Sequence, residues 1–421
     1  MEFTDLQRKQ ITASHRLFEN VFTLPSGQHM PFAAYVHKHY GNPNMLGQQF
    51  LFEGEDADGV PLAQRACDGY VLRVGGVDML SDGGGDLCAS KSANGMVAVK
   101  LYASIAKLCK AQGVFVRFGT PNDSSARFYR KGTDQIVGDF CNLSFSRREL
   151  ALPADAMRKL AEALGESEPT FCVTRSATCP FDDADLARIN ATRDGECRIV
   201  HSRESYAWVL EDYACVNGCT TPVYLSLRSK ADGGLMAFLA VREFEWGWCP
   251  VIDWGVFVDR PAAAPATMEL LLSALRRDCD QHVSVPMLNE ASCELDVFEP
   301  IGGIVEKTPD SHFGVHVYDG ASSEVAASVM DFSNWHVRAL DTDYFLNHKV
   351  PCPSDEEREA EYSDESWERI CRLLGGECTP DVERVIDDEL LSMREFGCND
   401  AAGSDSLAAR ARRKLKRILG R

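Results

Sequence analysis

Residues 91–132 constrain the fold more than any other stretch, because they combine a helix, a short strand and a second helix start. The apolar residues of the first helix recur at the spacing of one buried face: Val97, Leu101, Ile105 and Leu108. Gly113 follows, where a glycine often ends a helix, and Val114 to Phe118 then has the composition of a strand.

A polar break, Gly119 to Asn122, follows this strand, and a second helix is expected from about Asp123. A strand that leads through a polar break into a helix N-terminus is a natural place to bind a phosphate-bearing ligand. Any βαβ unit of an α/β domain has the same order of elements, so periodicity alone leaves both interpretations open.

The length and charge of the chain bound its class. With 421 residues it is long enough for two or three domains. Its net charge is −19 and its pI is about 5.0. Nucleic-acid binding depends on neutralising phosphates with cations, so we expect no nucleic-acid partner.

The 16 cysteines are scattered, without a CxxC pair, which favours reduced and buried thiols over a disulfide framework. Cys109, Cys141 and Cys249 lie among apolar residues, and we expect no metal site. The first residues are polar and charged, and no apolar run approaches the ~18 residues that span a bilayer. These features predict a cytoplasmic protein.

The order of expected elements occurs twice, which predicts an α+β protein with two tandem units and a helical C-terminal extension. The units are predicted at residues 1–150 and 169–345, with a polar connector at 151–168. Each contains an aromatic helix, antiparallel strands, a long helix, a strand, a short helix and a last strand.

Residues 346–421 differ from both units. Residues 354–400 are expected to form helices with solvated acidic faces, and residues 405–419 a basic amphipathic helix. A basic amphipathic helix can lie on an anionic membrane surface, which would make the protein membrane-peripheral. The alternative is a tail that pairs with the acidic segment before it. The sequence does not predict the oligomeric state.

The chain resembles the GNAT acyltransferase superfamily, and most closely the tandem-GNAT proteins found with bacterial surface-polysaccharide biosynthesis genes. In the first unit the matching stretches are Tyr40 to Pro43, the turn and helix at 91–111, and FGTPNDSSARFYRKG at 118–132. In the second unit and after it, the matching stretches are Arg203 to Trp208, Val251 to Asp253, Ile301 to Gly303, and Trp335 to Arg338 followed by Asp341 and Asp343.

The resemblance implies acetyl-CoA as the acyl donor and a small-molecule amine as the acceptor. In that fold a strand that splays from its neighbour pairs with the pantetheine chain, and the loop that opens the long helix holds the pyrophosphate. Here that loop comprises Lys91, Ser92, Asn94, Gly95, Met96 and Val97. Asn122 matches a residue that contacts the CoA arm, and Tyr129 matches the tyrosine that protonates the leaving thiolate.

No residue of the sequence is a clear general base. Asp78, Asp82 and Asp86 lie beside a glycine-rich turn, and such acids are usually part of a flexible, solvated loop. His37 and His39 flank the acceptor side if the first helices form its wall, although both are expected to be surface histidines.

The leading hypothesis is an N-acetyltransferase whose first unit is catalytic, with an amino sugar of surface polysaccharide as the acceptor. The loop at residues 91–97 departs from the family pattern and keeps only Gly95, so a non-catalytic GNAT-fold interaction protein is the alternative of another class. A Fem-type aminoacyl transferase is a further alternative, although the helical arm of those enzymes is not evident. The second unit has a proline-rich stretch, residues 259–265, where a pyrophosphate loop would lie.

Overall fold

The computed structural model describes eleven stretches of the chain: residues 3–43, 45–56, 60–93, 95–123, 125–126, 135–146, 150–218, 220–245, 247–275, 282–342 and 349–375. We call residues 3–146 the first half, residues 150–342 the second half and residues 349–375 the extension. The first half contains α1 (Asp5–Phe18), β1 (Gln28–His29), α2 (Phe32–Tyr40), β2 (Met45–Glu55), β3 (Pro61–Val74), β4 (Val77–Asp82), β5 (Gly85–Ala89), α3 (Gly95–Gln112), β6 (Val116–Gly119) and β7 (Gln135–Ser146).

The second half opens with a helix and continues through eight strands. Its elements are α5 (Pro153–Leu164), β8 (Phe171–Ser176), α6 (Asp183–Ile189), β9 (Cys197–Ile199), α7 (Arg203–Tyr206), α8 (Tyr213–Asn217), β10 (Thr220–Ser229), β11 (Leu235–Phe244), β12 (Trp248–Val256), α9 (Ala264–Ser273), β13 (His282–Asn289), α10 (Leu295–Phe298), β14 (Ile304–Val317), α11 (Ser323–Met330) and β15 (Trp335–His336). The extension adds β16 (Val350–Pro351), α12 (Asp355–Ala360) and α13 (Asp364–Leu374).

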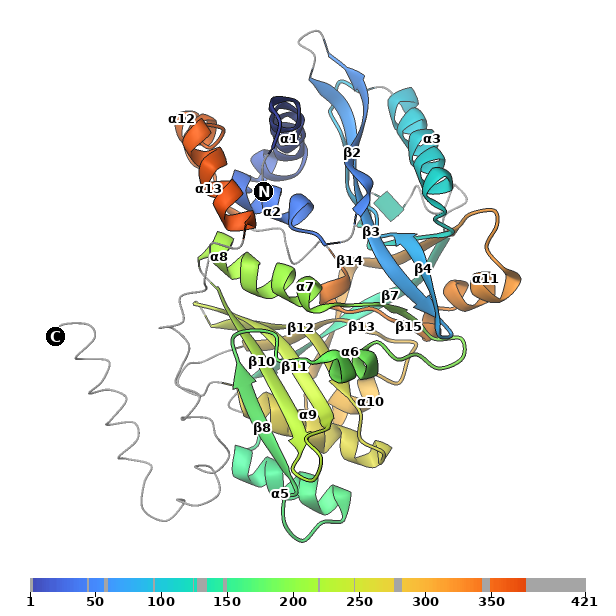
Figure 1. Ribbon diagram of the computed structural model, residues 1–421, viewed down its shortest axis with the longest axis vertical. Coiled ribbons are helices and arrows are strands. Elements are labelled where there is room, and N and C mark those ends of the chain that lie inside the picture. The colour runs from blue at the N-terminus through green and yellow to red at the C-terminus, as the bar shows by residue number, and fades with distance from the viewer. Residues whose placement is uncertain are drawn as a thin grey trace, which may run out of the picture.

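One mixed sheet runs through both halves (Figure 1). Its strand order is β15-β9-β3-β4-β6-β14-β7-β13-β12-β11-β10-β8, and β2 and β5 add to β3. Most neighbours are antiparallel, whereas β4–β6, β12–β13 and β9–β15 are parallel. This arrangement confirms the α+β class with a mostly antiparallel sheet flanked by helices.

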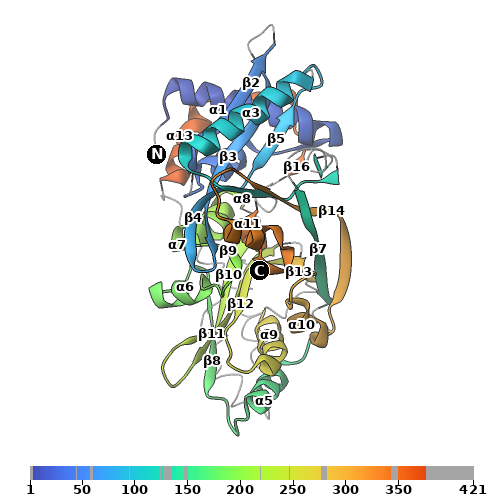
Figure 2. The same ribbon diagram turned by 90° about the vertical axis from the view of Figure 1, so that its right-hand side faces the viewer.

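The halves exchange a strand at the centre of this sheet. β7 of the first half pairs with β13 of the second, from Phe140↔Asn289 to Ser146↔His282. β14 of the second half pairs with β6 of the first, from Gly119↔Gly314 to Val116↔Val317. β7 and β14 also pair with each other and lie side by side in Figure 2. Each half therefore completes the sheet of the other, and the division into two tandem units stays a prediction.

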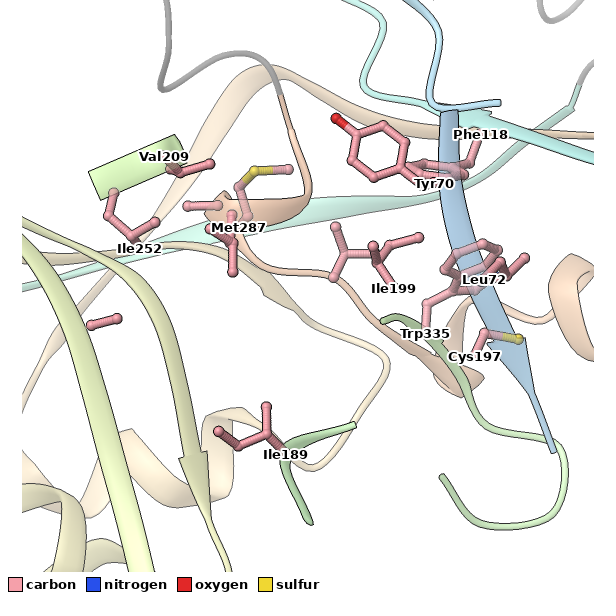
Figure 3. Close-up of a cluster of buried hydrophobic side chains, with 14 of the residues drawn as sticks. Tyr70, Leu72, Phe118, Ile189, Cys197, Ile199, Val209, Ile252, Met287 and Trp335 are labelled. Carbon is pink, nitrogen blue, oxygen red and sulfur yellow. The ribbon is translucent and has the colours of Figure 1, made fainter. Parts of the chain in front are cut away.

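The largest hydrophobic core is shared by both halves. Tyr70, Leu72 and Phe118 of the first half pack in one cluster with Ile199 and Trp335 of the second (Figure 3). The Trp335 side chain has no exposed surface, and its Nε1 donates to the carbonyl of Val329 at 2.8 Å. Because apolar burial is the main source of folding free energy, the two halves stabilise each other.

The helix expected in residues 91–111 is confirmed as α3, which ends at Gln112 and is followed by Gly113 with φ of 70°. Its fully buried positions are Leu101, Ile105 and Cys109, whereas Leu108 is only partly buried. Near the end of the helix the buried position is therefore Cys109, one residue later than the Leu108 that the sequence predicts. The expected strand that follows is confirmed as β6, all of whose residues are buried.

The aromatic helices of the two halves contact each other. They are α2 and the π-helix Ala207–Asp212 that follows α7. His37 Nε2 donates to the carbonyl of Trp208 at 2.9 Å, and Trp208 Nε1 donates to the carbonyl of His37 at 3.1 Å. A Cβ on Gly41 would lie 2.7 Å from Cδ1 of Trp208, so only glycine allows this approach.

The extension packs on the helices of the first half. Trp367 of α13 is buried against Phe3 and Phe32, at ring distances of 5.3 and 5.1 Å. β16 pairs with β1, and Glu361 reaches inward to the backbone N–H of Phe32 at 2.7 Å. The expected acidic helices exist up to residue 374, but the acidic Glu361 is engaged by the first half instead of being fully solvated.

Residues 376–421 lie outside the described residues, and so does the predicted basic helix at 405–419. Among the helices that the structure describes, none combines the length and the apolar character needed to cross a bilayer. Cys109, Cys141 and Cys249 are buried, as the sequence predicts.

Candidate functional site

Two parallel strands of the first half separate from one another. β4 and β6 pair at Ser81↔Val116 and Asp82↔Arg117. After Asp82 the chain continues into β5, whose one partner strand in the described part of the chain is β3. The edge of β5 away from β3 is therefore open, with backbone N–H and C=O groups that can pair with an extended ligand.

A β-bulge bends β5 at this place. Pairing with β3 moves from Ala66↔Gly85 to Gln64↔Cys88, so β5 contains one residue more than its partner. Asp86 lies in the extra turn with φ of 44°, a left-handed conformation that aspartate tolerates better than most residues. Bulges redirect strands and side chains, and this one coincides with the separation of the two strands.

Four charged side chains of alternating sign hold the bulge: Asp68, His39, Asp86 and Lys38. Lys38 Nζ lies 2.8 Å from Asp86 Oδ1, and His39 Nε2 lies 2.7 Å from Asp86 Oδ2. His39 Nδ1 faces Asp68 Oδ1 at 4.0 Å. Lys38 and His39 are adjacent residues at the end of α2, so this helix is fastened to the bulge.

Burial disfavours the charged forms of Asp86 and His39, but their ionic partners have the larger combined effect on the two pKa values. The pKa of Asp86 is held below its usual range by Lys38 and His39. The pKa of His39 is raised, because Asp68 and Asp86 more than compensate for burial. The contacts with Asp68 and Asp86 therefore favour the protonated form of His39. The expectation of a surface histidine is wrong for His39, and the expectation of a solvated loop is wrong for Asp86, whose side chain is only 6% exposed.

A second buried ion pair lies at the start of the separation. Arg65 Nη2 is 2.8 and 2.7 Å from the two carboxylate oxygens of Asp82, and neither side chain is appreciably exposed. Gly84 N–H also donates to Asp82 at 3.2 Å. A Cβ on Gly83 would lie 2.1 Å from the Tyr70 ring. The glycine-rich turn is thus closely packed, which corrects the expectation of a flexible, solvated loop at Asp82.

The remaining base candidates have other partners. Asp78 is half exposed at the far end of β4, and its hydrogen bonds with Arg73 lower its pKa. His37 is buried against Trp208, which corrects the surface expectation, and burial lowers its pKa to about 4. Of the candidate general bases, Asp86 therefore lies in the bulge and His39 contacts it, whereas Asp78 and His37 lie elsewhere.

Sequence reasoning missed Lys38, Arg65 and Asp68. The signal that could have found Arg65 is its place in a strand beside small residues, between Ala63 and Ala66–Cys67. A charged side chain there must find a buried partner, since an unpaired buried charge is strongly disfavoured.

The predicted pyrophosphate loop lies at the end of β5 and the start of α3. Lys91 and Ser92 are exposed, and Met96 is exposed as well, whereas Val97 lies on the buried face of α3. Gly95 is the first residue of α3, and Asn94 lies outside the described residues. The open edge of β5 therefore leads directly into the N-terminus of an 18-residue helix.

Asn122 lies after β6, across the separation from β5. Its Oδ1 accepts from the N–H and the hydroxyl of Ser125 at 2.9 and 3.0 Å, which makes it the cap of the helix that begins at Asp123. Tyr129 lies outside the described residues.

The second half repeats the divergence but fills it with its own side chains. β12 and β13 pair from Trp248↔His282 to Pro250↔Ser284, and β12 then bulges near Asp253. The guanidinium carbon of Arg338 lies 4.3 Å from the centroid of the Trp254 ring, and Arg338 Nη1 donates to Glu294 Oε1 at 2.5 Å. Thr342 contacts Met287 of β13, so residues 338–342 touch both separated strands.

The start of α9 also differs from that of α3. Pro261 and Pro265 occupy the turn and the first helical positions, and proline has no backbone N–H to donate. This half therefore has fewer donors for an anion at the corresponding place, in agreement with its proline-rich sequence.

A separate groove of about 500 Å³ lies between α1 and α13. Two of its cations already have partners, since Arg8 pairs with Asp364, and Arg16 pairs with Glu359 outside the lining. We assign it no ligand. Within the described stretches no three histidine, cysteine, aspartate or glutamate side chains are grouped to hold a metal ion.

No protein-family model matches the sequence, and the search of curated proteins finds no match. Solved structures are similar. A GCN5-related N-acetyltransferase from Anabaena variabilis aligns with a TM-score of 0.52 at 11% identity, over 73% of this chain and 70% of that chain. One from Kribbella flavida aligns with a TM-score of 0.48 at 14% identity, over 75% and 70%. The likeness to the Anabaena protein shows that this chain has the same fold.

Proposed function

We propose that the protein is an acetyl-CoA-dependent N-acetyltransferase that acts on a small amine, with its active site in the first half. The observation that carries this proposal is the separation of β5 from β6 next to the N-terminus of α3. An open strand edge pairs with the amide groups of an extended pantetheine chain. A helix N-terminus attracts its pyrophosphate through backbone N–H groups and the helix dipole.

The residues at the start of α3 fit a phosphate group. Lys91 supplies a cation, and the exposed Ser92 and Met96 leave the turn accessible from solvent. Backbone donors need no particular side chain, so the loss of the family's paired glycines is compatible with binding. We propose Asn122 on the opposite side of the separation as a contact of the CoA arm.

The chemistry is attack of an uncharged amine on the thioester carbonyl, loss of the extra proton of the attached nitrogen to solvent, and departure of the thiolate. We assign proton donation to the leaving sulfur to Tyr129, since a phenol can donate as negative charge develops. At the bulge His39 and Asp86 hydrogen-bond to each other, and Asp86 also binds Lys38, so we assign neither of them as the general base. We therefore propose that the acceptor amine loses its proton to solvent before it reacts.

We propose a small primary amine as the acceptor. The resemblance in sequence to proteins encoded with polysaccharide genes makes an amino sugar the first compound to test. The strongly negative net charge of the chain is compatible with a cationic amine that approaches from solution.

Acetyl-CoA is expected to raise the melting temperature by several degrees at saturating concentration. A ligand at 100 times its Kd that binds only the folded state adds about 2.7 kcal/mol to stability. Isothermal titration should give one site per chain, because residues 338–342 fill the equivalent place in the second half. No shift at millimolar acetyl-CoA would favour the non-catalytic alternative, and two sites would contradict the filled second half.

Two substitutions locate the binding site. Met96→Asp places a carboxylate on an exposed position of the first turn of α3, and should weaken acetyl-CoA binding about tenfold or more by repulsion. The matched control is Ala262→Asp, an exposed position before α9 that should leave binding unchanged.

Tyr129→Phe tests the proton donor. If acetyl-CoA binds, this substitution should lower kcat and leave the affinity for acetyl-CoA intact. Unchanged turnover would remove Tyr129 from the mechanism.

A further inference from the structure

His312 of the second half lies between two carboxylates of the first. Its Nε2 donates to Asp123 Oδ1 at 2.8 Å, and its Nδ1 donates to Asp139 Oδ1 at 2.5 Å. The imidazole is mostly buried, with 15% of its surface exposed, whereas about two thirds of each carboxylate is exposed. One side chain of the second half thus joins two segments of the first half.

The position of His312 follows from the strand exchange. Between Lys307↔Cys141 and His312↔Asp139, β14 advances by five residues while β7 advances by two, so β14 bulges there. Immediately after the bulge β14 pairs with β6 on its other edge while it stays paired with β7, and Gly314 lies opposite Gly119, the last residue of β6. The exchange therefore delivers His312 to the break that precedes the helix starting at Asp123.

Both ring nitrogens act as donors only when the imidazole is protonated. The hydrogen bonds to Asp139 and Asp123 raise the pKa of His312, in spite of the small opposing effect of burial. Charge-assisted hydrogen bonds of this kind are stronger than neutral ones, although the exposure of the carboxylates weakens the pair through solvent screening.

We propose that His312 is a positioning residue for acetyl transfer, which fixes the start of the helix after β6 by holding Asp123 against β7. This inference rests on the proposed function, since Asn122 and Tyr129 are the first-half residues assigned to acetyl-CoA on this segment. The second half then contributes to the reaction through His312, because its β14 supplies the side chain that orders the far wall of the site.

Hydrogen–deuterium exchange tests the contact without any substrate. His312→Ala should speed exchange of the amides of residues 120–126 by roughly three- to tenfold, as the helix start loses a charged hydrogen bond. His282→Ala is the matched control, because His282 also bridges the halves, through Ser144 of β7 at 3.2 Å, at the other end of that strand. It should leave residues 120–126 unchanged.

Steady-state kinetics tests the role in catalysis. In His312→Ala we expect the KM for acetyl-CoA to rise about fivefold with the KM for the amine unchanged, and His312→Gln to restore part of the loss. A double-mutant cycle should show coupling, with His312→Ala and Asp123→Ala together no worse than His312→Ala alone. Additive effects, or equal losses for both substrates, would overturn the positioning role.

The two proposals fail in different ways. His312→Ala could speed exchange at residues 120–126 in a protein that does not bind acetyl-CoA. That result would support the contact but overturn both the proposed function and the catalytic role. Unchanged exchange in a protein that turns over acetyl-CoA would overturn the role of His312 and retain the function.

Discussion

Arg65→Met is expected to lower the free energy of unfolding by about 3–5 kcal/mol, because it leaves the Asp82 carboxylate buried without its cation. Both side chains are buried, and one guanidinium nitrogen contacts both carboxylate oxygens. A methionine of similar length fills the space but offers no donor. Urea unfolding followed by circular dichroism measures the loss.

The same two strands provide a matched control for this prediction. Arg73 and Asp78 also pair β3 with β4, but 24% and 46% of their side chains are exposed. Arg73→Met should cost no more than about 1 kcal/mol, since exposed ion pairs contribute little. Arg65→Met combined with Asp82→Asn should be less destabilised than Arg65→Met alone. If Arg65→Met and Arg73→Met cost the same, the buried pair is not what holds the turn.

Stability is expected to peak near pH 6.5, because two histidines beside the extension require opposite protonation states. His29 donates to Glu19 and to Glu361, both at 2.9 Å, and these bonds outweigh burial and raise its pKa to about 9. His15 donates to the carbonyl of Met30 at 2.7 Å and accepts from Tyr362, and burial lowers its pKa to about 4. Glu361 and Tyr362 belong to the turn between α12 and α13.

The signs of the two contributions follow from linkage. The folded-state pKa of His29 is raised, so its contribution is complete below about pH 6.5 and is lost as the pH rises through about 9. The folded-state pKa of His15 is lowered, so its contribution is complete above about pH 6.5 and declines as the pH falls towards 4. Each separation from the unperturbed value corresponds to at most about 3 kcal/mol.

Urea unfolding between pH 5.5 and 9.5 measures this dependence. His29→Gln should remove most of the loss on the alkaline side and leave the acid side intact. His15→Gln should do the reverse, which makes each variant the control of the other. A wild-type profile that stays level from pH 6.5 to 9.5 would contradict the role of His29 as a charged link to Glu361.

Local patterns in the sequence predicted the elements well. The spacing of Val97, Leu101 and Ile105 and the glycine at position 113 predicted α3, because both depend on residues within one helix. The hairpin of β10 and β11 has a local signal of the same kind, a glycine-containing turn between two apolar runs. Such features are decided by neighbours in the chain, which the sequence displays directly.

Long-range pairing could not be predicted in the same way. Asp82 and Asp86 have the local sequence of an exposed turn. Their side chains can be buried because they pair with Arg65, Lys38 and His39, which belong to other elements. The exchange of β7 and β14 depends on which strand edges meet, and an alternating strand gives no signal of its partner. The candidate site was therefore predicted in outline, as a strand end and a helix start, while the charges that shape its bulge were not.

The strand exchange has a consequence for biosynthesis. When the ribosome has released residue 146, the edge of β6 still waits for β14, whose last residue is Val317. At about 5–20 residues per second this interval lasts roughly 10–30 s. Throughout it the nascent first half exposes an unfinished sheet edge, a surface that invites pairing with other chains. We therefore expect the sheet that joins the two halves to form only after β14 has been synthesised.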